Sequence, residues 1–104
     1  MANPSIYKVW FMKYTAAWYK LSVKEQNDIL TQNAASIKQV GAESLMVEMS
    51  VWSDENWMAW GVEKYPNIEA VQKHSVNLYK ENWFQYVDSK TYLGSDLPQT
   101  LMLA

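Results

Sequence analysis

The segment Trp60 to His74, WGVEKYPNIEAVQKH, constrains the fold of this chain more than any other stretch. Its first residues are aromatic and β-branched, as in a strand, and Pro66 blocks any extension of that strand. Asn67 can then cap a helix, and the amphipathic residues that follow include His74, the only histidine. The sequence therefore predicts a strand that passes directly into a helix, and this helix carries the one imidazole of the protein.

The N-terminal part of the chain repeats this order of strand and helix. Residues 5–14, SIYKVWFMKY, have the aromatic and β-branched composition of a strand. Ser22 and Glu25 have the spacing of a capping box, and Gly41 supplies a stop signal. We therefore expect a helix over residues 23–40.

The remaining elements follow from alternation and turn signals. Alternating apolar residues predict a strand over 43–52, and a polar turn separates it from another strand over 57–65. The helix that begins after Asn67 is expected to span residues 68–87. A short fourth strand over residues 91–93 is expected to end at a glycine.

This order, βαββαβ, is the ferredoxin-like pattern of the α+β class. It predicts a four-stranded antiparallel sheet with two helices on one face. At 104 residues the chain has the size of a single domain, residues 1–104.

The other face of the predicted sheet is also apolar. In the first strand Val9 and Phe11 alternate with Trp10 and Met12, so neither side reads as a solvated surface. Two helices cannot cover both sides. We therefore expect a homodimer in which a second copy packs its sheet against this one.

The C-terminal residues, 96–104, are too apolar for a free end. Leu97, Leu101 and Leu103 flank Pro98 in this segment. We expect this tail to dock on the partner subunit or across the edge of the sheet.

Composition argues against several functional classes. The chain has no cysteine, which excludes disulfides and metal-thiolate sites, and its nine lysines are scattered, without any arginine, at a net charge of −2. This pattern argues against nucleic-acid binding. The first residues lack a secretion signal and no run has membrane-spanning length, so a cytoplasmic protein with no membrane contact is expected. No paired metal ligands or glycine-rich phosphate loop is present, so neither a metal nor a cofactor is predicted.

The residues Glu63, Tyr65, Ala70 and His74 carry a family resemblance. Their order resembles that of the dimeric α+β barrel superfamily, particularly its antibiotic-biosynthesis-monooxygenase-like domains. The resemblance implies a dimer with a pocket between the sheet and the helices of each subunit. This superfamily includes cofactor-free oxygenases, isomerases, haem-handling enzymes and proteins of unknown role, so the fold does not fix the function. Nothing in this chain resembles a haem-specific motif.

His74 is the candidate for proton transfer, because a neutral imidazole can accept or donate a proton near neutral pH. The alternative is a half-buried histidine that is hydrogen-bonded to a carboxylate or a carbonyl at the edge of the core. Glu63 either holds the imidazole in one tautomer or is a solvated acid of the strand.

Aromatic side chains are the candidates for the pocket wall. The chain has six tryptophans and seven tyrosines, more than a small core can bury fully. Each of them either lines a ligand cavity or packs in the core or the dimer interface. The expected wall residues are Trp10, Tyr14, Trp52, Trp60 and Tyr65. Glu48 faces either the cavity or the partner subunit, and the alternation of the strand leaves both open.

Two functional hypotheses follow. One is a cofactor-free enzyme, of the monooxygenase or isomerase kind, that acts on an aromatic or apolar metabolite with His74 as the catalytic residue. The other is a ligand-binding or regulatory dimer with the same cavity and no turnover.

Overall fold

The computed structural model describes residues 4–98. Its elements are β1 (Ile6–Tyr14), α1 (Ala16–Tyr19), α2 (Val23–Gln39), β2 (Glu43–Met49), β3 (Ala59–Tyr65), α3 (Ile68–Lys80), α4 (Trp83–Tyr86) and β4 (Val87–Gly94). The expected tail interaction of residues 96–104 falls largely outside the described residues, since only 96–98 are described.

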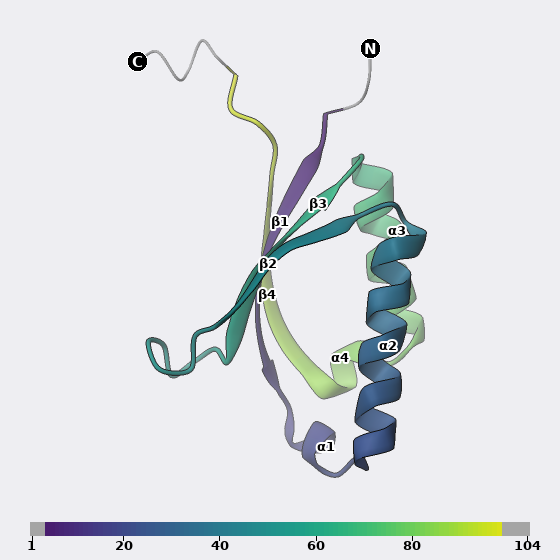
Figure 1. Cartoon of the computed structure of the whole chain (residues 1–104), viewed down its shortest axis with the longest axis vertical. Coiled ribbons are helices and arrows are strands. Elements are labelled where there is room, and N and C mark those ends of the chain that lie inside the picture. The colour runs from purple at the N-terminus through teal and green to yellow at the C-terminus, as the bar shows by residue number, and fades with distance from the viewer. Residues whose placement is uncertain (1–3, 99–104) are drawn as a thin grey trace.

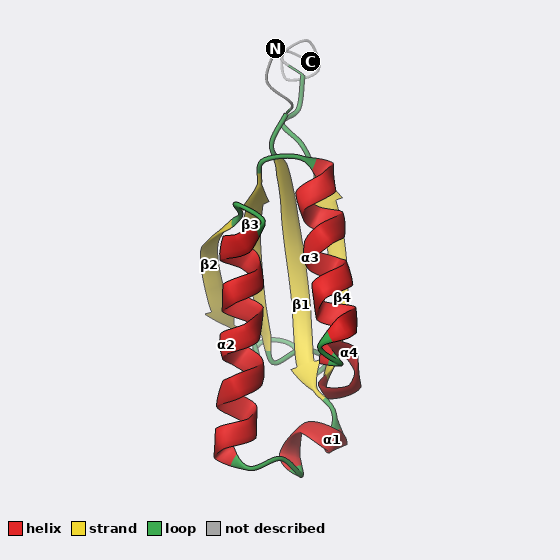
Figure 2. Cartoon of the chain, turned by 90° about the vertical axis from the view of Figure 1, so that its right-hand side faces the viewer, coloured by secondary structure: helices red, strands yellow, loops and turns green. Residues whose placement is uncertain are grey.

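The strands form one antiparallel sheet in the order β2-β3-β1-β4. Both long helices, α2 and α3, pack against the same face of this sheet, and the opposite face carries no helix from the described residues (Figures 1 and 2). The predicted ferredoxin-like α+β fold is therefore confirmed.

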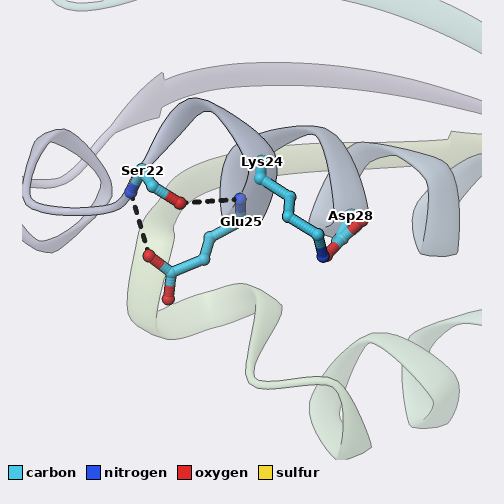
Figure 3. A network of polar contacts seen from close by, with 4 residues as sticks. All are labelled: Ser22, Lys24, Glu25 and Asp28. Carbon is cyan, nitrogen blue, oxygen red and sulfur yellow. Dashed lines mark hydrogen bonds and ion pairs between the residues drawn. The ribbon is translucent and has the colours of Figure 1, made fainter.

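Local signals place the two long helices where the sequence predicts them. At the start of α2 the Ser22 side chain accepts a hydrogen bond from the Glu25 amide at 3.1 Å, and the Glu25 carboxylate accepts one from the Ser22 amide at 3.0 Å (Figure 3). In the first two turns of α2, Lys24 and Asp28 form an exposed ion pair at 3.0 Å. The Asn67 side chain caps α3 by accepting from the Ala70 amide at 2.8 Å. These contacts satisfy amides that a helix start leaves free.

The helix expected to reach residue 87 is shorter than predicted. It ends at Lys80, and Asn82 then takes the left-handed backbone conformation with φ of 59°. The short helix α4 follows, and β4 begins at Val87 instead of Thr91. Asparagine tolerates this conformation better than most residues, and no glycine or proline marks the break in the sequence.

The hairpin between β2 and β3 is also longer than predicted. β2 ends at Met49 and β3 begins at Ala59. Ser50 closes the base of this loop, because its amide donates to the Met58 carbonyl at 2.9 Å and its hydroxyl donates to the Trp57 carbonyl at 3.0 Å. The short helix α1 is a further element that the sequence pattern does not predict.

Strand register decides which side chains face the helices. Trp10 pairs with Gly61, and Gly61 in turn pairs with Val47, so these positions share the helix-facing side. Phe11 pairs with Trp60 on the opposite, bare face. On the helix-facing side, Tyr65, Ala70 and Val71 form a small apolar core at one end of the sheet. The rest of the space between the layers holds the cavity described below.

Candidate functional site

A cavity of about 380 Å³ lies between the sheet and the helices. Its lining side chains come from all four strands and from α2, α3 and α4. Most of the wall is apolar or aromatic, and includes Trp10, Met12, Tyr14, Leu78, Trp83 and Phe84. Three ionisable side chains other than tyrosine reach it: Lys8, Glu63 and His74. This combination of an apolar wall with a few polar groups is typical of small-molecule sites.

Gly61 lies beneath Trp10, which is one of the residues of the cavity wall. A Cβ atom at Gly61 would lie 2.4 Å from Cζ2 of Trp10 and 2.7 Å from the carbonyl oxygen of Met46. No side chain fits at these distances, so the missing Cβ lets the indole lie directly against the sheet. The need for a glycine at position 61 becomes apparent only from the strand register, which pairs Gly61 with Trp10.

His74 lies on the inner face of α3 and is buried, with 1% of its surface exposed. Its Nδ1 atom is 2.8 Å from the Ser36 hydroxyl of α2, and the Asn77 amide donates to the same hydroxyl oxygen at 2.9 Å. Burial lowers the pKa of His74 to about 4, and the positive charge of Lys8 acts in the same direction. The imidazole is therefore neutral at physiological pH.

Lys8 and Glu63 face each other across β1 and β3, where they are register partners. Their side chains are almost fully buried, yet Nζ and Oε1 are 4.0 Å apart. The same carboxylate oxygen accepts a 2.6 Å hydrogen bond from the Tyr65 hydroxyl. Burial lowers the pKa of Lys8, while the Glu63 carboxylate opposes that shift. Burial and the bond to Glu63 both raise the pKa of Tyr65, which keeps its hydroxyl protonated.

Trp10 contributes an unpartnered donor to this region. Among the described residues, its Nε1 atom is the one buried side-chain nitrogen or oxygen without a hydrogen bond. A buried N–H group without an acceptor is uncommon in proteins and calls for an explanation.

The structure brings together some of the residues selected from the sequence. His74, Glu63, Trp10 and Tyr14 line the cavity. Tyr65 is fully buried behind it, with its ring centroid 6.1 Å from that of His74.

The other three selected residues lie elsewhere. Trp60 and Glu48 are register partners on the sheet face that points away from the helices. Trp52 lies in the hairpin loop with 80% of its surface exposed, and its indole donates to the Met49 carbonyl. None of these three residues lies in the cavity wall. For Trp60 the reason is the alternation along β3, which points its side chain away from the side that carries Glu63 and Tyr65.

Sequence reasoning missed Lys8, Ser36 and Asn77. Lys8 had a usable signal, since it is a charged residue two positions before Trp10 on the same face of β1. Ser36 and Asn77 had none, because their relation to His74 depends on how α2 and α3 pack.

Neither a metal site nor a membrane-spanning helix is found within residues 4–98. No group of three or more histidine, cysteine, aspartate or glutamate side chains is arranged to hold a metal ion. No helix in this range is both long enough and apolar enough to cross a membrane.

Comparisons with known proteins identify the fold. No protein-family model matches the chain, and no curated protein matches it in sequence. A heme-binding protein from Thermus thermophilus has a similar structure, with a TM-score of 0.73 at 14% identity, over 99% of this chain and 44% of that one. A chlorite dismutase variant from Candidatus Nitrospira defluvii gives a TM-score of 0.74 at 14% identity, over 99% and 44%.

A shorter structure is matched over its full length. It is a conserved protein of unknown function from Bacteroides thetaiotaomicron, described as a possible oxidoreductase, with a TM-score of 0.59 at 16% identity, over 91% of this chain and 100% of that one. By contrast, this chain spans less than half of the heme-binding protein and of the chlorite dismutase. At such identities the likeness establishes a shared ferredoxin-like α+β fold.

Proposed function

We propose that this protein binds a small apolar or aromatic metabolite in the cavity between its sheet and its helices. The observation that carries the proposal is the cavity itself, about 380 Å³ in volume and walled mainly by aromatic and apolar side chains. This volume lies within the range of sites that enclose small organic ligands. The fold shared with a heme-binding protein and a chlorite dismutase supports small-molecule binding as well.

A cofactor-independent, monooxygenase-like activity is the enzymatic form of this proposal. His74 would accept a proton from an electron-rich substrate, the electron pair would stay on the substrate, and dioxygen would be the oxidant. The neutral imidazole beside the buried ammonium of Lys8 favours this candidate, because Lys8 could stabilise the substrate anion. A pKa of about 4 also makes His74 a weak base, so only an acidic substrate proton could be removed. Ligand binding without turnover is therefore the better supported role.

Haem is the cofactor that the similar structures suggest. The described residues of the cavity do not provide the groups that would bind it. An axial histidine must present Nε2 to the iron, whereas only 1% of the His74 surface is exposed. Among residues 4–98, Lys8 is the only cationic side chain on the cavity wall, where two propionates would need partners. We therefore propose no bound cofactor.

Filling the cavity tests the proposed function. We expect neutral 2-naphthalenemethanol to bind the native protein in a calorimetric or NMR titration, and Ala59→Phe, which projects a ring into the cavity, to weaken binding at least about tenfold. Ala35→Phe introduces the same side chain at an exposed position of α2 and should leave affinity unchanged. Failure of the native protein to bind this probe would contradict the proposal. Native mass spectrometry of the purified protein would identify any metabolite that it retains.

We also propose that the protein is a homodimer of the α+β barrel type, located in the cytoplasm. The bare face of the sheet carries an aromatic cluster in which Phe11 lies 6.2 Å from Trp57 and 6.4 Å from Tyr92, measured between ring centroids. Trp60 and Val62 extend this apolar surface along β3. A second copy presenting the same surface would bury it, as in sheet-on-sheet packing.

Sedimentation tests the dimer. We expect the native protein to sediment at twice the chain mass at micromolar concentration and Phe11→Glu to sediment as a monomer, because a carboxylate cannot be buried unpaired between two sheets. Val76→Glu changes an exposed apolar residue of α3 and should leave the dimer intact. A native protein that sediments as a monomer would contradict the proposed dimer.

A further inference from the structure

Lys8 is a largely buried cation with one carboxylate neighbour among the described residues. It faces the cavity from β1 and has 9% of its surface exposed. Among the described residues, the one carboxylate oxygen within 4.0 Å of Nζ is Glu63 Oε1. An ammonium group has three donors, and burying it without partners carries a large desolvation penalty.

Glu63 is turned toward a different partner. Its Oε1 atom accepts the Tyr65 hydroxyl at 2.6 Å, a distance typical of a strong hydrogen bond, while Lys8 remains at 4.0 Å. The carboxylate therefore offers Lys8 electrostatic attraction without occupying its donors. Those donors are left for a group that enters the cavity.

A second free donor lies on the same strand. Trp10 follows Lys8 by two residues, so both side chains are on the helix-facing side of β1, and Trp10 Nε1 is buried without an acceptor among the described residues. An indole N–H can only donate. The helix-facing side of β1 thus carries the Lys8 ammonium, with Glu63 as its one carboxylate neighbour within 4.0 Å, and a buried N–H group without an acceptor among the described residues.

We propose that the cavity ligand carries an anionic oxygen of the carboxylate class on an apolar or aromatic body, and that this oxygen binds Lys8. The inference rests on the proposed function, since it names the chemical class of ligand for the same cavity. The aromatic wall receives the body of the ligand, and Lys8 fixes its orientation from the sheet side. A neutral ligand would leave the ammonium with Glu63 alone at 4.0 Å.

A matched pair of probes tests this inference on the native protein. 2-Naphthoate and 2-naphthalenemethanol have the same ring system and differ in the charge of the substituent. We expect 2-naphthoate to bind at least about tenfold more tightly at pH 7, because a charge-assisted hydrogen bond is about twice as strong as a neutral one.

Variants then assign the preference to Lys8. Lys8→Met keeps the apolar stem and removes the charge, so the preference for 2-naphthoate should fall to within about twofold while the affinity for 2-naphthalenemethanol is retained. Retained binding of the neutral probe shows that the variant is folded. Lys90→Met removes a lysine on the opposite face of the sheet and should keep the native preference.

The outcomes separate the two proposals. If both probes bind the native protein equally, the cavity binds aromatic molecules but the inference about an anionic oxygen is wrong, and the Lys8 and Glu63 charges simply cancel. If the preference persists in Lys8→Met, another group binds the anion and the assignment to Lys8 is wrong. If neither probe binds, the proposed function itself fails.

Discussion

The Ser36 hydroxyl of α2 lies 2.8 Å from Nδ1 of His74 on α3, and this contact is buried. The Asn77 amide donates to the same hydroxyl and to Gln39 Oε1, so the two helices are joined by a small polar network. Ser36 is the one buried residue of α2. The position of the imidazole at the cavity therefore depends on a serine that is 38 residues away in the sequence.

Replacing Ser36 with alanine should destabilise the protein by about 1 to 3 kcal/mol, because it leaves His74 Nδ1 and the Asn77 amide without a shared partner in a buried place. Thr31→Ala, at an exposed position of the same helix, should change the free energy of unfolding by less than about 0.5 kcal/mol. Urea denaturation of both variants measures the difference. Equal stabilities would mean that the network contributes nothing.

The stability of the protein should fall as the pH drops through the range set by His74. The pKa of His74 is about 4 in the folded protein, below the ordinary value of 6.5 that applies to the unfolded chain, so the unfolded chain takes up a proton first. The contribution is complete above pH 6.5 and is lost as the pH falls toward 4, by up to about 3 kcal/mol. His74→Gln should show a smaller loss over the same interval. Denaturation curves at about pH 7, 5.5 and 4.5 would contradict this assignment if both proteins lost stability in parallel.

Gly61→Ala should destabilise the protein by about 1 to 3 kcal/mol, because the added methyl group meets the Trp10 ring on one side and the Met46 carbonyl on the other. The backbone carbonyl cannot move without disturbing the pairing of β2 and β3. Gly94→Ala is the matched control, since no described atom lies within 4 Å of the place that its Cβ would take. Thermal unfolding of the pair tests the packing, and a Gly61→Ala protein as stable as the control would rule out the close approach of the indole to the sheet.

Asn82→Gly should be neutral or stabilising, whereas Asn82→Ala should cost about 1 kcal/mol, because alanine tolerates the left-handed conformation poorly. Asn27→Ala, on an exposed turn of α2, should be slightly stabilising, since alanine is the better helix former. Calorimetric unfolding of these variants separates the effect of backbone conformation from the loss of an asparagine. If Asn82→Ala changed the stability as Asn27→Ala does, the left-handed conformation of Asn82 would carry no energetic cost for alanine, and the prediction would be wrong.

The fold could be predicted from local signals in the sequence. Ser22 with Glu25, and Pro66 with Asn67, fix the helix starts through contacts between residues that are close in the chain. The helix end at Lys80 could not be predicted in this way, because Asn82 breaks the helix by its backbone conformation alone.

The site was predictable only in part. Alternation along β3 separates Trp60 from Tyr65, since residues five positions apart face opposite sides, so a strict parity argument would have kept one of them out of the cavity. It could not tell which of the two sides the helices cover. The pairing of His74 with Ser36 depends on helix packing, which a single sequence does not encode locally.

The pairing of β1 with β4 has a consequence for biosynthesis. Tyr7 pairs with Gly94 and Tyr14 with Val87, so β1 pairs with a strand that lies far from it in the sequence. Closing such a distant contact is slow compared with forming local hairpins. On the ribosome, β1 would expose one unpaired edge, and the cavity would lack a wall, until residue 94 had emerged. The proposed ligand binding therefore requires β4, and a ligand present when β4 pairs would favour this pairing over aggregation of the open edge.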